Sequence, residues 1–168
     1  VQGKIELYIY GPIDRDKEYW KQCQQLIDQM PENIKVHYQG AVEHSEIHSV
    51  FSQHHLFFFP TRGENFGHII VESLAAGCPV LLSDRTPWTD FDKKGAGWIV
   101  PLNERHRFKN ILEQVVAMSH SELDTYSQQA TQYATDVIND LETLEQNRRL
   151  FALEVEVKNS SDHKHINT

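Results

Sequence analysis

The amino-acid sequence predicts an α/β protein with a doubly wound, Rossmann-like, mostly parallel sheet. Short apolar runs bounded by turn residues alternate along the chain with segments of helical periodicity. One unit is particularly clear: an apolar, aromatic strand at 55–59 is followed by a polar loop, a short apolar helix and a second apolar strand at 79–82. A helix that joins two buried strands is typical of a βαβ unit, so we expect these strands to be parallel.

The first third of the chain predicts two further strands. Residues 4–10 combine β-branched and aromatic side chains and end at a Gly-Pro turn. Apolar residues from Tyr19 to Met30 then follow a helical period, with Tyr19, Cys23, Leu26, Ile27 and Met30 on the predicted inner face. The alternating run 34–38 predicts a second strand that leads into Gly40, and residues 45–53 predict a short helix.

The last half of the chain predicts a strand followed by helices. The helix after residue 66 should stop at Gly77, where a positive φ costs little. Further elements are a turn or single helical turn at 85–91, a strand at 95–101, a helix at 108–118, a helix opened by the capping-box-like Ser121–Asp124, and an amphipathic helix reaching Phe151.

We expect residues 1–153 to form one domain and 154–168 a disordered tail.

Composition narrows the classes of function. The 168 residues carry a formal net charge of −8, and 39% are hydrophobic, which is ordinary for a globular domain. No basic stripe interleaved with aromatic residues is present, so nucleic acid is not an expected partner. Two cysteines form no disulfide framework, and no signal peptide or membrane-spanning run is visible. These features favour a cytoplasmic protein.

The loop Arg62–Gly67 and the helix after it have the residues of a ligand site. The loop delivers backbone N–H groups to a helix N-terminus, where a phosphate or sugar oxygen is favoured. Glu72 lies on a helix that is apolar nearly all round, where a carboxylate needs hydrogen-bond partners. The two hydroxyls of a ribose would supply them. The alternative is a carboxylate at the helix rim with no ligand.

One ordered run of residues begins Pro60-Thr61-Arg62-Gly63-Glu64-Asn65-Phe66-Gly67 and continues through Glu72 to Gly77-Cys78-Pro79-Val80. This run resembles the E-x7-E signature of family-4 glycosyltransferases. Those enzymes are retaining and have the GT-B architecture of two Rossmann-like domains, with the signature in the C-terminal, donor-binding domain. The resemblance extends to about Phe151. Asn65 stands where the family usually has Gly, and Asn also tolerates the left-handed region.

The resemblance implies a nucleotide-sugar donor and transfer of its sugar, with retention, to an acceptor hydroxyl during glycan or polysaccharide synthesis. Glu64 would be the catalytic-site carboxylate that positions the sugar. The implied substrate-binding residues are Asn65, Phe66, Gly67, His68, Glu72 and Gly40. His68 could instead simply start the helix, and Gly40 could be a turn glycine. No metal or other cofactor is implied.

The resemblance also implies parts outside these residues. An acceptor glycan or lipid-linked sugar would bind an N-terminal domain, and the full-length parent could lie at the inner membrane face. The family's first strand, with its Arg and Lys loop, has no counterpart before residues 4–10. We therefore expect an interrupted sheet, closed by rearrangement or by a second copy of the chain, and no sugar transfer by this chain alone.

Weaker motifs favour solvated surface over chemistry. Asp14-Arg15-Asp16 could hold a divalent ion, but acidic residues are expected where a helix starts. His44 and His48 have a spacing that metals use, yet no third ligand is evident. Trp88 is expected to pack in the core rather than shield the pocket. Two rival functions remain open, a non-catalytic nucleotide-sugar binding module and a structural α/β interaction domain.

Overall fold

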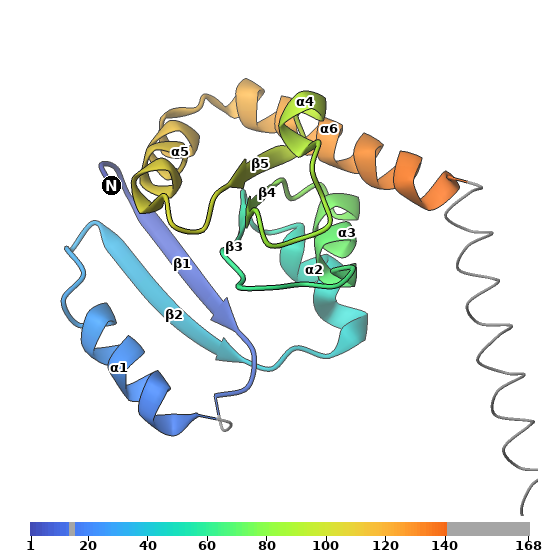
Figure 1. Ribbon diagram of the computed structural model, residues 1–168. Coiled ribbons are helices and arrows are strands. Elements are labelled where there is room, and N and C mark those ends of the chain that lie inside the picture. The colour runs from blue at the N-terminus through green and yellow to red at the C-terminus, as the bar shows by residue number, and fades with distance from the viewer. Residues whose placement is uncertain (14–15, 141–168) are drawn as a thin grey trace, which may run out of the picture.

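A computed structural model describes residues 1–13 and 16–140, and it contains two parallel sheets (Figure 1). The first sheet pairs β1 with β2, and the second has the strand order β3-β4-β5. The strands are β1 (Ile5–Tyr10), β2 (Ile34–Gly40), β3 (Phe57–Phe59), β4 (Val80–Ser83) and β5 (Gly97–Val100). The α-helices are α1 (Lys17–Ile27), α2 (Ile47–Phe51), α3 (His68–Ala75), α4 (Phe91–Lys94), α5 (Arg105–Ala117) and α6 (His120–Asn139), and a 3-10 turn, η1, spans His44–Glu46.

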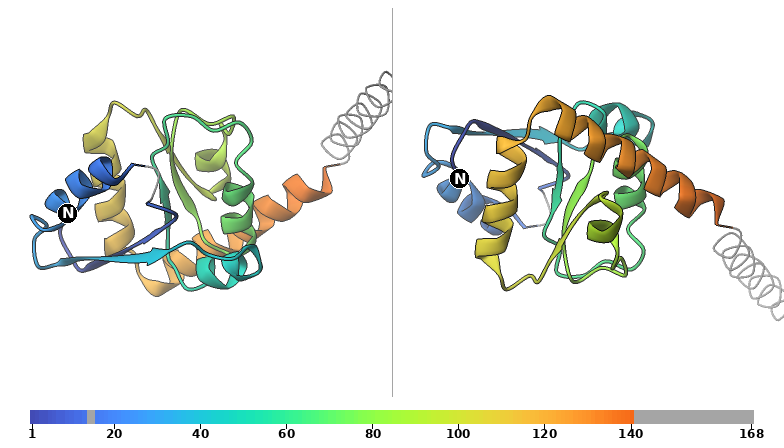
Figure 2. Two further views of the ribbon diagram at one scale, coloured as in Figure 1. Left: turned by 90° about the horizontal axis from the view of Figure 1, so that it is seen from below. Right: turned by 90° about the horizontal axis from the view of Figure 1, so that it is seen from above.

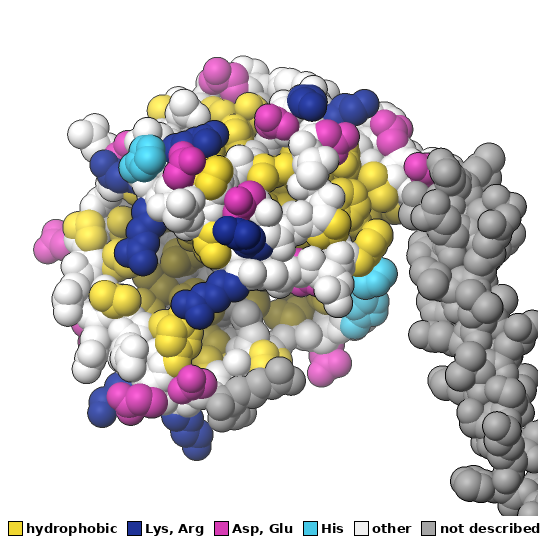
Figure 3. Space-filling view, viewed as in Figure 1, with side chains coloured by type: hydrophobic (Ala, Val, Ile, Leu, Met, Phe, Trp, Pro, Cys, Tyr) yellow, Lys and Arg dark blue, Asp and Glu magenta, His cyan; other side chains and the backbone are white. Residues whose placement is uncertain are grey.

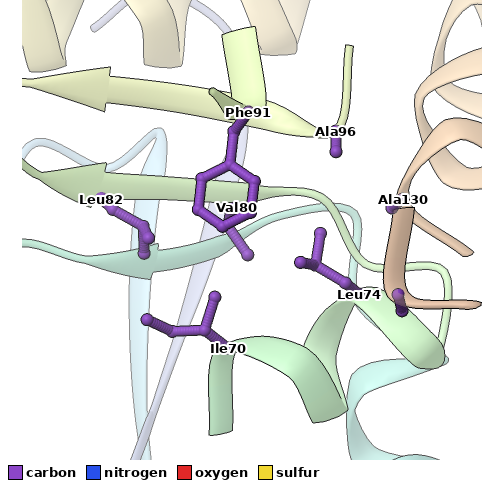
Figure 4. Packing of buried hydrophobic residues seen from close by; sticks show 8 residues of the cluster. Ile70, Leu74, Val80, Leu82, Phe91, Ala96 and Ala130 are labelled. Carbon is purple, nitrogen blue, oxygen red and sulfur yellow. The ribbon is translucent and has the colours of Figure 1, made fainter. Parts of the chain in front are cut away.

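The β3-β4-β5 sheet is the centre of the core. Successive side chains of a strand point to opposite faces, so β4 contributes Val80 and Leu82 to one face and Leu81 to the other. The first face packs against Ile70 and Leu74 of α3, together with Phe91 and two alanines of α6 (Figure 4). The second face packs against α5, which lies across the sheet from α3 (Figure 2). This sheet is therefore covered on both faces, as its continuous apolar strands predict.

The β1-β2 sheet is covered much less completely. Its strands pair in parallel from Ile5 with Ile34, with one irregularity near Tyr10. None of the described residues before Gly67 is buried. The predicted inner face of α1 is only partly confirmed. Cys23 and Ile27 are half-buried, but Tyr19, Leu26 and Met30 are exposed. A stripe of the helix has no described element against it, so its side chains stay in solvent.

The interruption expected in the sheet is present. β1 and β3 are the edges that face each other, and each pairs with only one described strand. A groove lined by residues 6–10 of β1 and by residues 56–59 separates them. Tyr8 and Tyr10 reach across it to His54, whose ring centroid lies 4.9 Å from that of Tyr8.

Three boundaries differ from the sequence prediction. The cap of α6 is Ser119, which forms a capping box with Glu122, so the box lies two residues earlier than Ser121–Asp124. The helical turn expected at 85–91 begins only at Phe91. α6 continues without a break to Asn139, while Leu141, Leu144 and Phe151 of the expected last helix and the expected tail lie outside the described residues.

Candidate functional site

The candidate site is the loop that connects β3 to α3, and three hydrogen bonds hold this loop in place. The buried Ser83 hydroxyl donates to the Thr61 carbonyl over 2.5 Å. The Glu64 amide donates to the Arg85 carbonyl over 3.1 Å. Further along, the indole N–H of Trp88 donates to the Phe66 carbonyl over 2.7 Å. These bonds fix the loop to the segment after β4, at the carboxyl ends of the strands, where doubly wound sheets bind ligands.

Gly67 shapes the junction between the loop and α3. Its φ of 78° lies in the left-handed region, and a Cβ there would meet Ile70 Cδ1 at 2.6 Å and Glu64 Cγ at 3.0 Å. The position therefore requires glycine for both conformation and space. Because Gly67 has no side chain, it offers no cap, and the first N–H groups of α3 remain available to a ligand.

Glu64 and Asn65 form a tight pair in the same loop. The Glu64 carboxylate accepts a hydrogen bond from the Asn65 amide over 2.9 Å, and Glu64 is half-buried. No described non-glycine residue has a positive φ. Asn65 therefore does not adopt the left-handed backbone conformation that asparagine tolerates. The loop thus turns without the family's glycine, and Glu64 is held close to Gly67.

Glu72 lies one helical turn further along α3, on its half-exposed side. Its side chain is 30% exposed, and the Nδ1 atom of His44 lies 3.6 Å from its Oε1 atom. This distance is longer than a good hydrogen bond. The carboxylate therefore keeps acceptor capacity for another partner, as the sequence argument required.

His44 is the residue near Glu72 that the sequence did not predict as part of the site. It follows Gly40 by four residues and lies within 3.6 Å of Glu72, so the loop after β2 approaches α3 here. The side chain of His44 is 86% exposed. Gly40 itself has a φ of 75° and ends β2. The loop that starts after Gly40 approaches Glu72 through His44.

The aromatic residues beside the loop form a connected group. The Phe66 ring lies 4.8 Å from that of His68 and 5.5 Å from that of Trp88, measured between centroids. Trp88 also stacks on the buried Phe91. The expected core packing of Trp88 is confirmed, and its N–H in addition supports the site loop. His68 is the first residue of α3 and is exposed.

Other candidate chemistry is not supported by the geometry. Asp14 lies outside the described residues, and Asp16 caps α1 by accepting from the Tyr19 amide over 2.9 Å, as expected of a helix start. Within residues 1–13 and 16–140 no group of three ligating side chains could hold a metal ion. Burial raises the pKa of the Cys78 thiol to about 12, so this thiol stays protonated. No helix in the described part of the chain is long and apolar enough to cross a membrane.

Comparison with known proteins agrees with this geometry. A family model described as Glycosyl transferases group 1 matches residues 1–135. The chain belongs to this glycosyltransferase family. No curated protein matches the chain significantly in sequence.

Solved glycosyltransferase structures share the fold. WaaG, described as a glycosyltransferase involved in lipopolysaccharide biosynthesis, has a TM-score of 0.61 at 16% identity over 88% of this chain and 46% of its own. Anabaena Alr3699/HepE, solved in complex with UDP-glucose, has a TM-score of 0.67 at 18% identity over 86% of this chain and 40% of its own. The C-terminal domain of LpcC from Francisella tularensis, a glycosyl transferase group 1 family protein, has a TM-score of 0.64 at 14% identity.

These comparisons define which part of the architecture is present. The match with the LpcC C-terminal domain covers 80% of this chain and 86% of that domain, whereas the chain spans less than half of WaaG and of Alr3699/HepE. The expected α/β fold of a GT-B C-terminal domain is thereby confirmed for this member of the family. Identities below 20% support the fold only, so the roles of individual residues rest on the geometry.

Proposed function

We propose that this chain binds a nucleotide-sugar donor at the loop between β3 and α3, for retaining transfer of the sugar to an acceptor hydroxyl. The observation that carries the proposal is Glu72, a half-exposed carboxylate with unused acceptor capacity on a mostly apolar helix. It lies on the same helix whose uncapped N-terminus suits the donor diphosphate. The UDP-glucose held by the related Alr3699/HepE fold supports the class of ligand.

Each site residue has a role in the proposal. Glu72 accepts from the two ribose hydroxyls, while Glu64 accepts from hydroxyls of the sugar. The backbone at Phe66 and Gly67, with the first N–H groups of α3, donates to the diphosphate and stabilises the charge that develops as it leaves. Asn65 and His68 flank the sugar, and Gly40 lies in the loop beside the base. The proposal needs neither a metal nor a protein nucleophile.

The reaction then balances without a covalent enzyme intermediate. The acceptor oxygen bonds to the anomeric carbon on the face from which the diphosphate departs, so configuration is retained. The bond between that carbon and the diphosphate oxygen breaks, and the acceptor's proton passes to that oxygen. The acceptor and its site remain part of the proposal for the whole enzyme, as do a role in polysaccharide synthesis, a cytoplasmic location and contact with the inner membrane face. We expect the 168-residue chain by itself to bind the donor without transferring its sugar.

Titration calorimetry tests the two carboxylates separately. The chain is titrated with UDP-glucose, GDP-mannose and ADP-glucose, and the preferred donor is then compared with its free nucleoside diphosphate. Glu72→Gln should weaken the binding of both ligands by about 1.5–3 kcal/mol, because a charge-assisted acceptor becomes a neutral amide. Glu64→Ala should weaken binding of the sugar donor and leave binding of the nucleoside diphosphate nearly unchanged. Equal losses for both ligands in the Glu64 variant would contradict the assigned roles.

A matched control and a turnover assay complete the test. Glu18→Gln makes the same chemical change on the exposed first turn of α1 and should leave affinity unaltered. Donor binding that survives Glu72→Gln unchanged would remove the ribose assignment. Absence of binding by all three donors would favour the structural interaction domain, whereas sugar release to an acceptor by the chain alone would overturn the expected lack of transfer.

A further inference from the structure

Thr86, in the segment after β4, has a buried hydroxyl without a hydrogen-bond partner in the described part of the chain. One other buried side-chain atom there lacks such a partner, and that atom, His37 Nε2, lies 3.8 Å from a carboxylate oxygen of Glu6. A buried polar group that makes no hydrogen bond is costly, so native proteins contain few of them and each needs an explanation. Thr86 therefore deserves a search for the group that its hydroxyl binds.

The sequence around Thr86 explains why the hydroxyl finds no local partner. Threonine hydroxyls commonly bond to nearby backbone groups. The next residue is Pro87, which has no N–H group to offer. The Arg85 amide donates to the Ser83 hydroxyl over 3.4 Å, and the Arg85 carbonyl accepts from the Glu64 amide. The adjacent backbone groups are thus absent or have other partners.

Two hydrogen bonds place Thr86 beside the site loop. The Arg85 carbonyl, directly before it, accepts from the Glu64 amide over 3.1 Å. The indole N–H of Trp88, two residues after it, donates to the Phe66 carbonyl over 2.7 Å. Thr86 lies between these two anchors, alongside the part of the loop where we place the sugar.

The surface over the two loops also suits a sugar. The space-filling view, taken from the same side as Figure 1, shows mostly atoms that are neither charged nor hydrophobic over the loops after β3 and β4 (Figure 3). Such a surface offers hydrogen bonds without a strong field of either sign. It therefore fits a neutral ligand that is rich in hydroxyls.

We propose that Thr86 is a further donor-binding residue, whose hydroxyl binds a hydroxyl of the donor sugar. This inference rests on the proposed function, because it takes the sugar to lie at Glu64. A sugar hydroxyl has one hydrogen to donate and lone pairs that accept, whereas an ionised carboxylate only accepts. Glu64 satisfies the hydrogen of a sugar hydroxyl, and the Thr86 hydroxyl donates to its lone pair. The two residues together select a sugar with a hydroxyl at that position.

A rotation of the Thr86 side chain brings its hydroxyl to the ligand. The residue as a whole is half-buried although its Oγ1 atom is buried, so another part of it reaches the surface. Staggered rotamers of threonine exchange the places of its hydroxyl and its methyl group. The backbone is less free to move, because a residue before proline is confined to extended conformations and the two anchors hold the segment. Donor binding thus pairs the hydroxyl by one change of rotamer.

Titration calorimetry of Thr86→Val tests the inference, because valine has nearly the shape of threonine and no hydroxyl. Affinity for the preferred sugar donor should fall about tenfold, and affinity for the free nucleoside diphosphate should stay within about twofold. Thr86→Ser keeps a hydroxyl and should retain donor affinity within about threefold. Thr135→Val makes the same change on the exposed side of α6 and should leave both affinities unaltered.

Urea unfolding of the same variants distinguishes ligand binding from a structural role. A hydroxyl that is unpaired in the free protein does not stabilise its fold, so Thr86→Val should leave the urea midpoint unchanged or raise it. Three-bond NMR couplings of the Thr86 methyl carbon report its rotamer and should change at saturating donor. A lower midpoint, unchanged couplings, or equal losses of affinity for both ligands would overturn the inference.

The same titrations separate this inference from the proposed function. Donor binding that Glu72→Gln weakens and Thr86→Val leaves unchanged would keep the nucleotide-sugar site and overturn the role of Thr86 alone. No binding of UDP-glucose, GDP-mannose or ADP-glucose by the unaltered chain would overturn both.

Discussion

The two sheets show how strands of similar sequence character reach very different degrees of burial. β1 and β2 are aromatic and β-branched, yet they contain no buried residue. β4 is buried at every position. The difference comes from neighbours, because β4 lies between two strands and under helices on both faces, whereas β1 has one strand partner. The candidate site is built on the well-covered sheet, which fixes its loop.

The largest expected difference is in core truncations. Leu74→Ala removes a fully buried side chain between α3 and the sheet, so it should lower the free energy of unfolding by about 2–5 kcal/mol. Leu7→Ala removes the same atoms from half-buried β1 and should cost less than about 1.5 kcal/mol. Urea unfolding followed by circular dichroism measures both. Equal losses would show that the two sheets are equally packed.

A smaller effect is expected where the site loop meets the core. Trp88→Phe keeps an aromatic ring on Phe91 but removes the hydrogen bond to the Phe66 carbonyl. Stability should fall by about 1 kcal/mol, and donor affinity should fall with it because the loop loses a tether. Trp98→Phe is the control, since Trp98 stacks on Tyr126 away from the loop. An unchanged donor affinity in Trp88→Phe would separate the tether from the site.

The smallest effect is a pH dependence at the groove. Burial lowers the pKa of His54, so the unfolded chain binds its proton more readily than the folded chain does. This contribution to stability is complete above the unfolded pKa, about 6.5, and is lost as pH falls through the folded value. His54→Gln should therefore flatten the decline in stability between pH 7 and 5, whereas the exposed His48→Gln should not. Urea midpoints across that range measure it, and an identical slope in both variants would contradict the assignment.

The sequence predicts the secondary structure around the candidate site well. The unit from β3 through α3 to β4 follows from periodicity and from Gly77, which has a φ of 75° as expected. The contacts of Glu72 with His44 and of Trp88 with Phe66 join residues more than 20 positions apart. No spacing rule reports such pairs, because they depend on how loops from different strands meet. The interruption between the sheets was predicted from the family pattern, but the exposed stripe of α1 was not, since periodicity shows a helix without showing what covers it.

The most direct test of the central claim is amide mapping by NMR of the chain with increasing UDP-glucose, with GDP-mannose and ADP-glucose in parallel. We expect chemical-shift changes at Glu64–Glu72 and in the loop from Gly40 to His44 for the donor that binds, with none in α1. Shift changes confined to the groove between β1 and β3, or none at millimolar donor, would contradict a nucleotide-sugar site on the β3–α3 loop.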